Sequence, residues 1–131
     1  MKVMNKHFSF IVSGYKMPYS KDNNYYENNW LKGFVKINSI TIFKFEFLQV
    51  EEVVELSKWI ERFENQKKPQ VKFEFIDPYI KFKSLRKNGF KSVKFICPEN
   101  DNPKIYHELS IDNIGAFGKE ISLIINKFPV R

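Results

Sequence analysis

The first quarter of the chain places one short apolar run before a long polar segment. Residues 8–12 are mostly apolar and are followed by Gly14, which predicts a first strand that ends at the glycine. The run is too short for the apolar part of a secretory signal, and no small-residue cleavage site follows it. Residues 16–29 contain Pro, Ser, Asp and many Asn residues, with tyrosines among them. Turn-forming residues dominate there, so we expect an irregular loop, and long loops in compact domains are often functional.

Beyond this loop the pattern becomes that of strands. Residues 30–47 are rich in β-branched and aromatic residues, and Phe43, Phe45 and Phe47 alternate with charged residues. Alternation at period two predicts strands, with these rings on one buried face. The dipeptide Asn38-Ser39 predicts a hairpin turn between two strands.

The period then changes to that of a helix. Apolar residues recur three and four positions apart over residues 50–63, and the charged residues between them occupy the opposite side. This pattern predicts an amphipathic helix of about four turns. Pro69 cannot continue a helix, so we expect the helix to end between Asn65 and Pro69.

The second half of the chain repeats the order of strands followed by a helix. Alternating segments predict further strands at residues 71–75, 80–83, 93–97 and 105–111. The pair Asn88-Gly89 is the strongest hairpin signal in the chain. Apolar residues at helical spacing over 114–128 predict a closing helix, with Ser110 or Asp112 as its N-cap and Pro129 after its end.

The order of elements is therefore strands, helix, strands, helix. Hairpin connections imply antiparallel pairing, and each helix must lay its apolar side on a sheet. We expect an α+β fold of two layers with one or more antiparallel sheets. No linker or change of composition interrupts the 131 residues, so residues 1–131 are expected to form a single domain.

The charge of the chain raises nucleic acid as a partner. It carries 22 basic and 15 acidic residues, a net charge of +7. The excess lies in two blocks, since residues 1–49 carry 7 basic and 3 acidic residues and residues 66–98 carry 9 and 2, whereas the helix over 50–65 carries 2 and 5. Only 3 of the basic residues are arginine, the residue that makes bidentate contacts with bases and phosphates. Nucleic-acid binding is therefore the weaker interpretation.

Residues that could support catalysis or bind a metal are scattered. His7 and His107 lie far apart and Cys97 is the only cysteine, so no metal-ligand cluster is predicted. A lone cysteine also excludes an internal disulfide and fits a reducing compartment, which favours a cytoplasmic protein. No apolar run approaches the length of a membrane span, and the glycines form no phosphate-binding loop. We expect no cofactor, no membrane partner and no enzymatic activity.

Two features keep other functions open. A pair of Cys97 and His107 would suit a hydrolase, although Cys97 follows an apolar strand face where a thiol is usually a buried core residue. Lysines at 44, 72, 81, 83 and 94 alternate with core aromatic residues, so several are expected to share an exposed sheet face. Such a face is either a solvated surface that discourages aggregation or a binding surface for an acidic partner or nucleic acid.

The aromatic loop resembles a known family. The run Tyr25-Tyr26-Glu27-Asn28-Asn29-Trp30-Leu31, preceded by Gly14-Tyr15 and Pro18, resembles the opening pattern of the WapI-like immunity proteins, which are antidotes of contact-dependent polymorphic toxins. Asp77 stands where that family usually has Glu. Further matches follow in the family's order at Glu46, Trp59-Ile60, Phe75-Ile76-Asp77-Pro78, Glu99, Pro103 and Phe128-Pro129-Val130-Arg131.

The resemblance implies a cytoplasmic, non-enzymatic protein, a monomer or weak dimer, that neutralises a cognate toxin domain by occlusion. Exposed Tyr and Trp side chains are frequent anchors of protein interfaces, and charge complementarity speeds capture. Either a basic toxin surface meets the acidic helix, or an acidic one meets the lysine-bearing sheet. We expect the loop and the acidic helix to make the contact through Tyr19, Asp22, Tyr25, Tyr26, Glu27, Glu51 and Glu55.

Overall fold

The computed structural model describes residues 2–4, 8–65, 72–76, 79–100, 102 and 104–131. The elements in this part of the chain are, in order, β1 (Lys2–Met4), β2 (Phe8–Tyr15), α1 (Tyr25–Asn28), β3 (Trp30–Ile37), β4 (Ile40–Gln49), α2 (Val50–Asn65), β5 (Lys72–Glu74), β6 (Lys81–Lys87), β7 (Phe90–Pro98), β8 (Tyr106–Ile111) and α3 (Ile114–Lys127).

The strands pair in chain order into two antiparallel sheets. Sheet A contains β1 to β4, and sheet B contains β5 to β8. One hairpin in each sheet turns at a predicted dipeptide: Asn38 and Ser39 have φ angles of 49° and 69°, and Asn88 and Gly89 have φ angles of 52° and 79°. Positive φ at both central residues gives a turn whose twist matches that of the strands. The predicted α+β fold with antiparallel sheets is confirmed.

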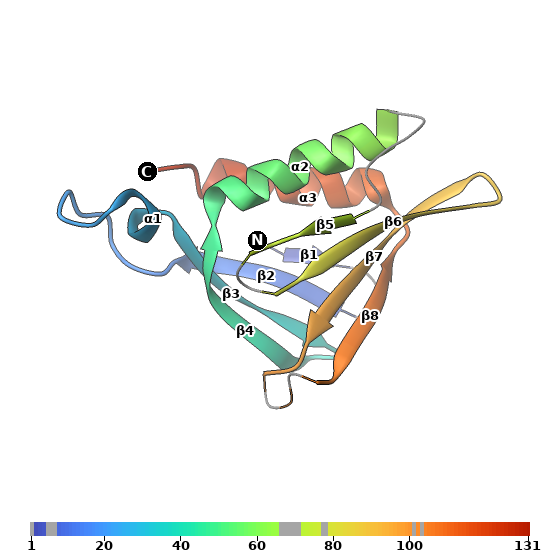
Figure 1. Cartoon of the computed structure of the whole chain (residues 1–131), viewed down its shortest axis with the longest axis horizontal. Coiled ribbons are helices and arrows are strands. Elements are labelled where there is room, and N and C mark those ends of the chain that lie inside the picture. The colour runs from blue at the N-terminus through green and yellow to red at the C-terminus, as the bar shows by residue number, and fades with distance from the viewer. Residues whose placement is uncertain (1, 5–7, 66–71, 77–78, 101, 103) are drawn as a thin grey trace.

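The two sheets converge at one end and separate at the other, where α2 and α3 lie side by side across them (Figure 1). At the converging end, the backbone N–H of Asn100 donates to the Ile42 carbonyl over 3.0 Å. The Asn100 side chain also exchanges hydrogen bonds with the backbone of Lys44. The helix pair therefore forms one layer, and the two sheets, bent toward each other, form the second.

Aromatic rings fill the space between the sheets and the helices. Phe10 of sheet A lies 6.0 Å from Phe95 of sheet B between ring centroids, and Phe82 of sheet B lies 5.8 Å from Phe117 of α3. Full burial of one large apolar side chain contributes about 1.5–3 kcal/mol. The apolar side of α2 faces this core as its spacing predicts, through Val50, Val53, Leu56, Trp59, Ile60 and Phe63.

A lysine from the second half of the chain stabilises the end of α2. The Nζ of Lys91 donates to the carbonyls of Phe63 and Glu64 over 3.2 and 2.9 Å. These are among the last carbonyls of the helix, which have no partner within it, and a cation at this end also interacts favourably with the helix dipole. Lys91 therefore fastens the β6–β7 hairpin to α2. The helix ends at Asn65, and Pro69 lies outside the described residues.

The structure corrects three expectations about element boundaries. The predicted irregular loop over 16–29 contains the short helix α1, and β1, whose three residues are too few to show a period, was not predicted. The N-cap of α3 is Asn113, whose side chain accepts from the N–H of Ala116 over 3.0 Å. The predicted caps stand too early, since Ser110 belongs to β8 and its hydroxyl donates to Asp112.

The predicted row of inward-facing rings at Phe43, Phe45 and Phe47 does not extend to Phe47. Leu31 pairs with Leu48 and Gly33 pairs with Phe45, so β4 has one residue more than β3 across this interval. Such a bulge moves the following residue to the other face of the strand. Leu48, which is fully buried, therefore continues the inward row. Phe47 instead packs edge to face against Trp30, with ring centroids 5.0 Å apart.

Candidate protein-binding surface

The segment between β2 and β3 is held in place by buried asparagines. Asn28 is 6% exposed and Asn29 is fully buried. The Oδ1 of Asn28 accepts the N–H of Ser20 and the Nδ2 of Asn23, both over 3.1 Å, and its Nδ2 donates to the Ser20 carbonyl. The Nδ2 of Asn29 donates to the Tyr25 carbonyl over 2.8 Å. Buried polar groups are costly unless they are hydrogen-bonded, so these bonds fix the path of the segment.

Arg131 fastens the same segment to the closing residues of the chain. Its Nε donates to the Asn28 carbonyl and its Nη2 to the Met17 carbonyl, each over 2.8 Å. Its backbone N–H donates to the Oδ1 of Asn29 over 2.7 Å, and its guanidinium lies 3.7 Å from the centroid of the Tyr15 ring. Residues that carry the family resemblance thus meet from the two ends of the sequence: Tyr15, Asn28 and Asn29 near the start, and Arg131 at the end. Their role in the structure is to hold this segment.

Helix α1 presents two tyrosines at the surface. The Asn24 side chain accepts the N–H of Glu27 over 2.9 Å, and the Glu27 carboxylate accepts the N–H of Asn24 over 3.0 Å. This capping box stabilises a helix of only four residues. The Tyr25 hydroxyl donates to the carboxylate of Glu51 on α2, and this bond raises the pKa of Tyr25. Tyr26 packs edge to face on Tyr25 and is 61% exposed.

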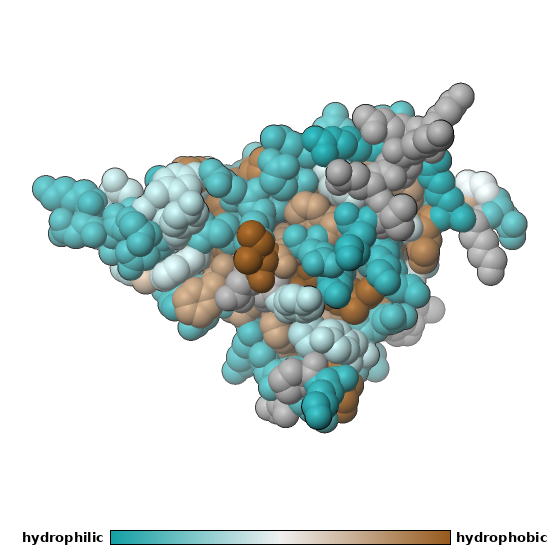
Figure 2. Space-filling model, in the orientation of Figure 1, coloured by the Kyte–Doolittle hydropathy of each residue, from teal (hydrophilic) through white to brown (hydrophobic). Residues whose placement is uncertain are grey.

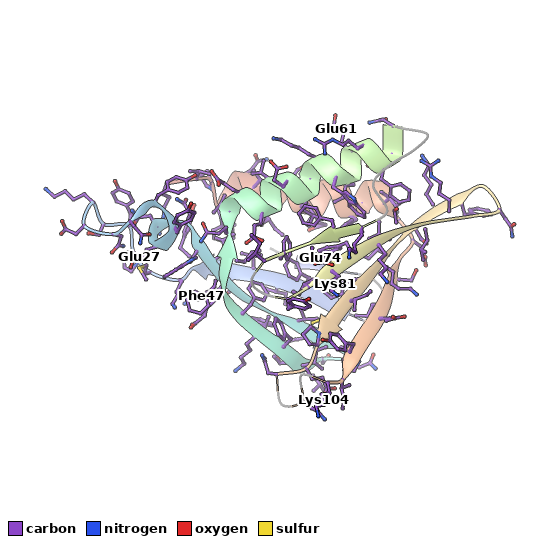
Figure 3. All side chains as sticks on the ribbon, viewed as in Figure 1. Glu27, Phe47, Glu61, Glu74, Lys81 and Lys104 are labelled. Carbon is purple, nitrogen blue, oxygen red and sulfur yellow. The ribbon has the colours of Figure 1, made fainter. Side chains whose placement is uncertain are left out.

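A groove of about 580 Å³ lies between α1, the junction of β4 and α2, and the segment after β5. Figure 3 places Glu27 and Phe47 together at this end of the molecule, and Figure 2 shows apolar and near-neutral surface there beside the hydrophilic tip of the 16–24 segment. The groove therefore combines aromatic and aliphatic walls with acidic groups. It is lined by Asn24, Tyr26, Trp30, Phe47, Gln49, Glu51, Glu52 and Ile76.

Glu52 positions one wall of this groove. Its Oε2 accepts the backbone N–H of Ile76 over 2.7 Å, and its Oε1 accepts the N–H of Gln49 over 3.3 Å. The backbone of Ile76 is thereby tied to α2, while its side chain is 88% exposed. Apolar surface that is rimmed by polar groups and held by a rigid backbone is typical of protein interaction sites.

The groove brings together several of the residues predicted from the sequence. Tyr26 and Glu51 line it, and Tyr25 bonds to Glu51 beside it. Glu27 lies in the same helix, but its carboxylate serves the cap of α1 and its side chain is half-buried. These four residues therefore form one continuous part of the surface.

The remaining predicted contact residues lie outside the groove. Tyr19 is 58% exposed in the segment that leads to α1, and Asp22 is exposed in a turn there, where its N–H donates to Ser20. Glu55 lies one turn further along α2 and pairs with Lys58 over 3.3 Å. Spacing along the sequence did not separate these residues from those that line the groove.

Four residues that line the groove and matter for its chemistry were not predicted from the sequence. Phe47 was expected in the core, and only the bulge in β4 turns it outward. Gln49 and Glu52 reach the groove because β4 runs directly into α2. Ile76 carried a signal, since it is an apolar residue on the polar side of the alternation that ends at Phe75.

Of the five lysines, Lys44 lies on sheet A, and the other four lie on sheet B. On sheet B, Lys72 pairs in register with Lys83, and Lys83 with Lys94, so three lysines form a row across β5, β6 and β7. Their strand neighbours Phe73, Phe82 and Phe95 point into the core, which places the row on the outer face.

Acidic side chains neutralise part of this outer face. Glu74 lies 2.9 Å from Lys72 and 3.9 Å from Lys81, and Glu108 lies 3.2 Å from Lys94. Figure 3 shows Glu74 and Lys81 near each other on sheet B, apart from Phe47. The face is thus a mixed surface with a modest excess of positive charge.

The candidate hydrolase pair is arranged unfavourably for nucleophilic chemistry. Cys97 and His107 are register partners on β7 and β8. However, Cys97 is fully buried, and burial raises the pKa of its thiol to about 12. A thiol with this pKa stays protonated at neutral pH, whereas the thiolate is the nucleophile. The Nε2 of His107 lies 2.6 Å from a carboxylate oxygen of Glu99 and is engaged there.

The described part of the chain contains no group of three or more His, Cys, Asp and Glu side chains that could hold a metal ion. His7 lies outside the described residues. Within the same residues, every helix is too short or too polar to cross a membrane.

Comparison with known proteins identifies the family. The sequence model described as the Immunity protein WapI-like family matches residues 3–129. No curated protein and no solved structure matches the chain. Because the match covers nearly the whole chain, the protein belongs to the WapI-like immunity protein family, and the resemblance stated from the motifs is confirmed.

Proposed function

We propose that this family member is a single-domain antidote over residues 1–131 that binds the toxic domain of a cognate polymorphic toxin in the cytoplasm. It acts without catalysis and without a cofactor, by covering the toxin stoichiometrically as a monomer or weak dimer. The observation that supports this proposal most directly is the aromatic, acid-bearing groove beside α1.

The groove has the properties that tight protein binding requires. Tyr26 and Ile76 expose 61% and 88% of their area, and both stand on backbone that hydrogen bonds hold in place. Rigid surfaces lose little entropy on binding, and aromatic anchors supply most of the binding energy in typical interfaces. A standard interface buries roughly 800 Å² on each partner, which would extend from the groove over the neighbouring Tyr19 and Tyr25.

Substitutions at the groove test this function. The partner to be tested is any toxin domain found encoded beside this gene, coexpressed with each variant in a bacterial host and titrated by calorimetry. Tyr26→Ala and Ile76→Ala should each weaken binding by at least about tenfold, since each truncates an exposed anchor. Growth protection should fail in the double variant. The thermal midpoint should stay within a few degrees of the wild-type value.

A matched control comes from sheet B, outside the groove. Tyr106 on β8 is 51% exposed and does not line the groove. Tyr106→Ala should leave both affinity and protection unchanged. If Tyr106→Ala weakens binding as much as Tyr26→Ala does, the groove is not the binding surface.

The alternative function is nucleic-acid binding by the lysine row of sheet B. The register of Lys72, Lys83 and Lys94 favours it, and the pairing of two of these lysines with glutamates opposes it. It predicts an affinity that falls steeply with salt. Absence of a retarded complex with tRNA and with duplex DNA at low salt would exclude it.

A further inference from the structure

The walls of the groove carry two kinds of group that attract the same ligand. The rings of Tyr26, Trp30 and Phe47 lie among its lining residues together with the carboxylates of Glu51 and Glu52. Aromatic faces attract cations through their quadrupole, and carboxylates attract them through charge. We propose that the partner docks by placing an arginine side chain in this groove. This inference rests on the proposed function for the identity of the partner as a toxin.

A cation already occupies one side of the aromatic wall. The Nζ of Lys16 lies 3.6 Å from the centroid of the Phe47 ring and 5.0 Å from that of Trp30. This ammonium is paired with Glu46 over 3.3 Å. The rings therefore lie where a positive charge is favourable. Lys16 and Glu46 neutralise each other, so the negative charge of the groove comes from Glu51 and Glu52.

The Glu51 carboxylate can accept further donors. It accepts the hydroxyl of Tyr25, and an ionised carboxylate offers about four acceptor positions. A guanidinium uses two of these in a bidentate contact. Glu52 adds a second negative charge one residue along α2, in the first turn, where the positive end of the helix dipole attracts anionic side chains.

The free acceptor positions of Glu51 favour arginine over lysine as the occupant, because a carboxylate accepts a bidentate contact from a guanidinium. A guanidinium carries five N–H groups in a planar fork and can reach two acceptors at once. An ammonium is a compact point charge and makes such paired contacts less readily.

The two tryptophans of the chain provide a reporter and an internal control. Trp30 lines the groove, whereas Trp59 is 1% exposed in the core. The probes are three blocked tripeptides, Leu-Arg-Leu, Leu-citrulline-Leu and Leu-Glu-Leu, titrated to 20 mM against ¹⁵N-labelled protein at low salt. Citrulline keeps the shape of arginine and removes its charge. The indole N–H resonances are then followed for each probe.

The arginine peptide should shift the Trp30 indole resonance saturably and leave that of Trp59 unchanged. Its affinity should exceed that of the citrulline peptide by about tenfold, because a charge-assisted contact is lost in the latter. Glu51→Gln should remove most of this preference. Glu61 is an exposed carboxylate further along the same helix (Figure 3), and Glu61→Gln should preserve the preference for arginine over citrulline.

Three outcomes would overturn the inference. One is an equal shift with the citrulline or glutamate peptide, and another is no shift of Trp30 with the arginine peptide at 20 mM. The third is a Trp30 shift that depends on protein concentration alone, which would assign the groove to a second copy of this chain.

Failure of the inference is separable from failure of the proposed function. If Tyr26→Ala and Ile76→Ala abolish toxin protection while the arginine peptide does not bind, the groove is the toxin site and only the choice of arginine is wrong. If the peptide binds and both variants protect fully, the proposed role of the groove in toxin neutralisation is wrong.

Discussion

At the scale of single residues, the segment before β3 depends on a few buried polar groups. Asn29 is fully buried, and its side chain bonds to the Tyr25 carbonyl and to the backbone of Arg131. Arg131 in turn supplies the donors for the carbonyls of Met17 and Asn28. Removing one partner of a buried hydrogen bond leaves the other with the full cost of desolvation. The position of α1 therefore rests on contacts between residues far apart in the sequence.

Arg131→Ala should lower the free energy of unfolding by about 2–3 kcal/mol, since two bonds from a charged group and a cation–π contact are lost together. Urea denaturation measures this change. Hydrogen exchange at Ser20 and Asn23 should accelerate beyond the global effect. Arg62→Ala removes an exposed arginine of α2 and should change stability by less than about 0.5 kcal/mol. Equal losses in the two variants would contradict the role given to Arg131.

Cys97 links stability to alkaline pH. Burial raises the pKa of its thiol from 9.0 to about 12, so between these values the unfolded chain loses the proton that the folded chain keeps. The free energy of unfolding should therefore fall as pH rises above 9, by up to about 1.4 kcal/mol per pH unit relative to Cys97→Ala. Urea denaturation of both proteins at several pH values between 7 and 10.5 tests this. A constant difference between them across that range would show that the thiol titrates normally.

At the scale of elements, sequence periodicity predicted the structure where it was sustained. The helical spacing over 50–63 and 114–128 correctly predicted α2 and α3. The dipeptides Asn38-Ser39 and Asn88-Gly89 correctly predicted the β3–β4 and β6–β7 hairpins. The pattern failed where one extra residue changes the facing of a strand. The bulge in β4 turned Phe47 outward and thereby created part of the groove wall. Such a bulge depends on pairing with β3, which the residues of β4 alone do not encode.

Gly33 marks the tightest backbone approach next to that bulge. A Cβ at this position would lie 1.9 Å from the carbonyl oxygen of Ile11 and 2.6 Å from the Phe45 ring. Because the obstacle is backbone, Gly33→Ala should destabilise the fold by about 3 kcal/mol or abolish soluble expression. Gly118→Ala on α3 is the matched control, since its Cβ would make ordinary contacts of 3.6 Å. That variant should gain about 0.5–1 kcal/mol from helix propensity. Urea denaturation should give effects of opposite sign, and the same sign in both would refute the packing argument.

At the scale of the whole molecule, charge separates into two surfaces. Glu51 and Glu52 line the groove, and the row of Lys72, Lys83 and Lys94 lies on the outer face of sheet B. The blocks of charge along the sequence predicted this separation. They did not predict that Ile76 would line the groove beside Glu51 and Glu52, because that depends on the hydrogen bond from its backbone N–H to Glu52. The contributions of Tyr25, Tyr26 and Glu51 were therefore predictable from the sequence, and the wall formed by Ile76 was not.

The net charge of +7 should slow capture of a partner whose docking segment is basic. Replacing Lys72, Lys83 and Lys94 by glutamine lowers the net charge to +4 and leaves the groove intact. The toxin domain should then associate a few-fold faster at low salt with an unchanged dissociation rate, because long-range repulsion falls while the contacts persist. Stopped-flow rates for the two proteins should converge near 0.5 M salt, where charges are screened beyond roughly 4 Å.

The variant with arginine at the same three positions keeps the charge and should behave as the wild type. Slower association of the glutamine variant, with the arginine variant unaffected, would mean that the lysine face itself meets an acidic toxin surface. The groove would then not be the binding surface, because an acidic surface of the toxin would be repelled by Glu51 and Glu52.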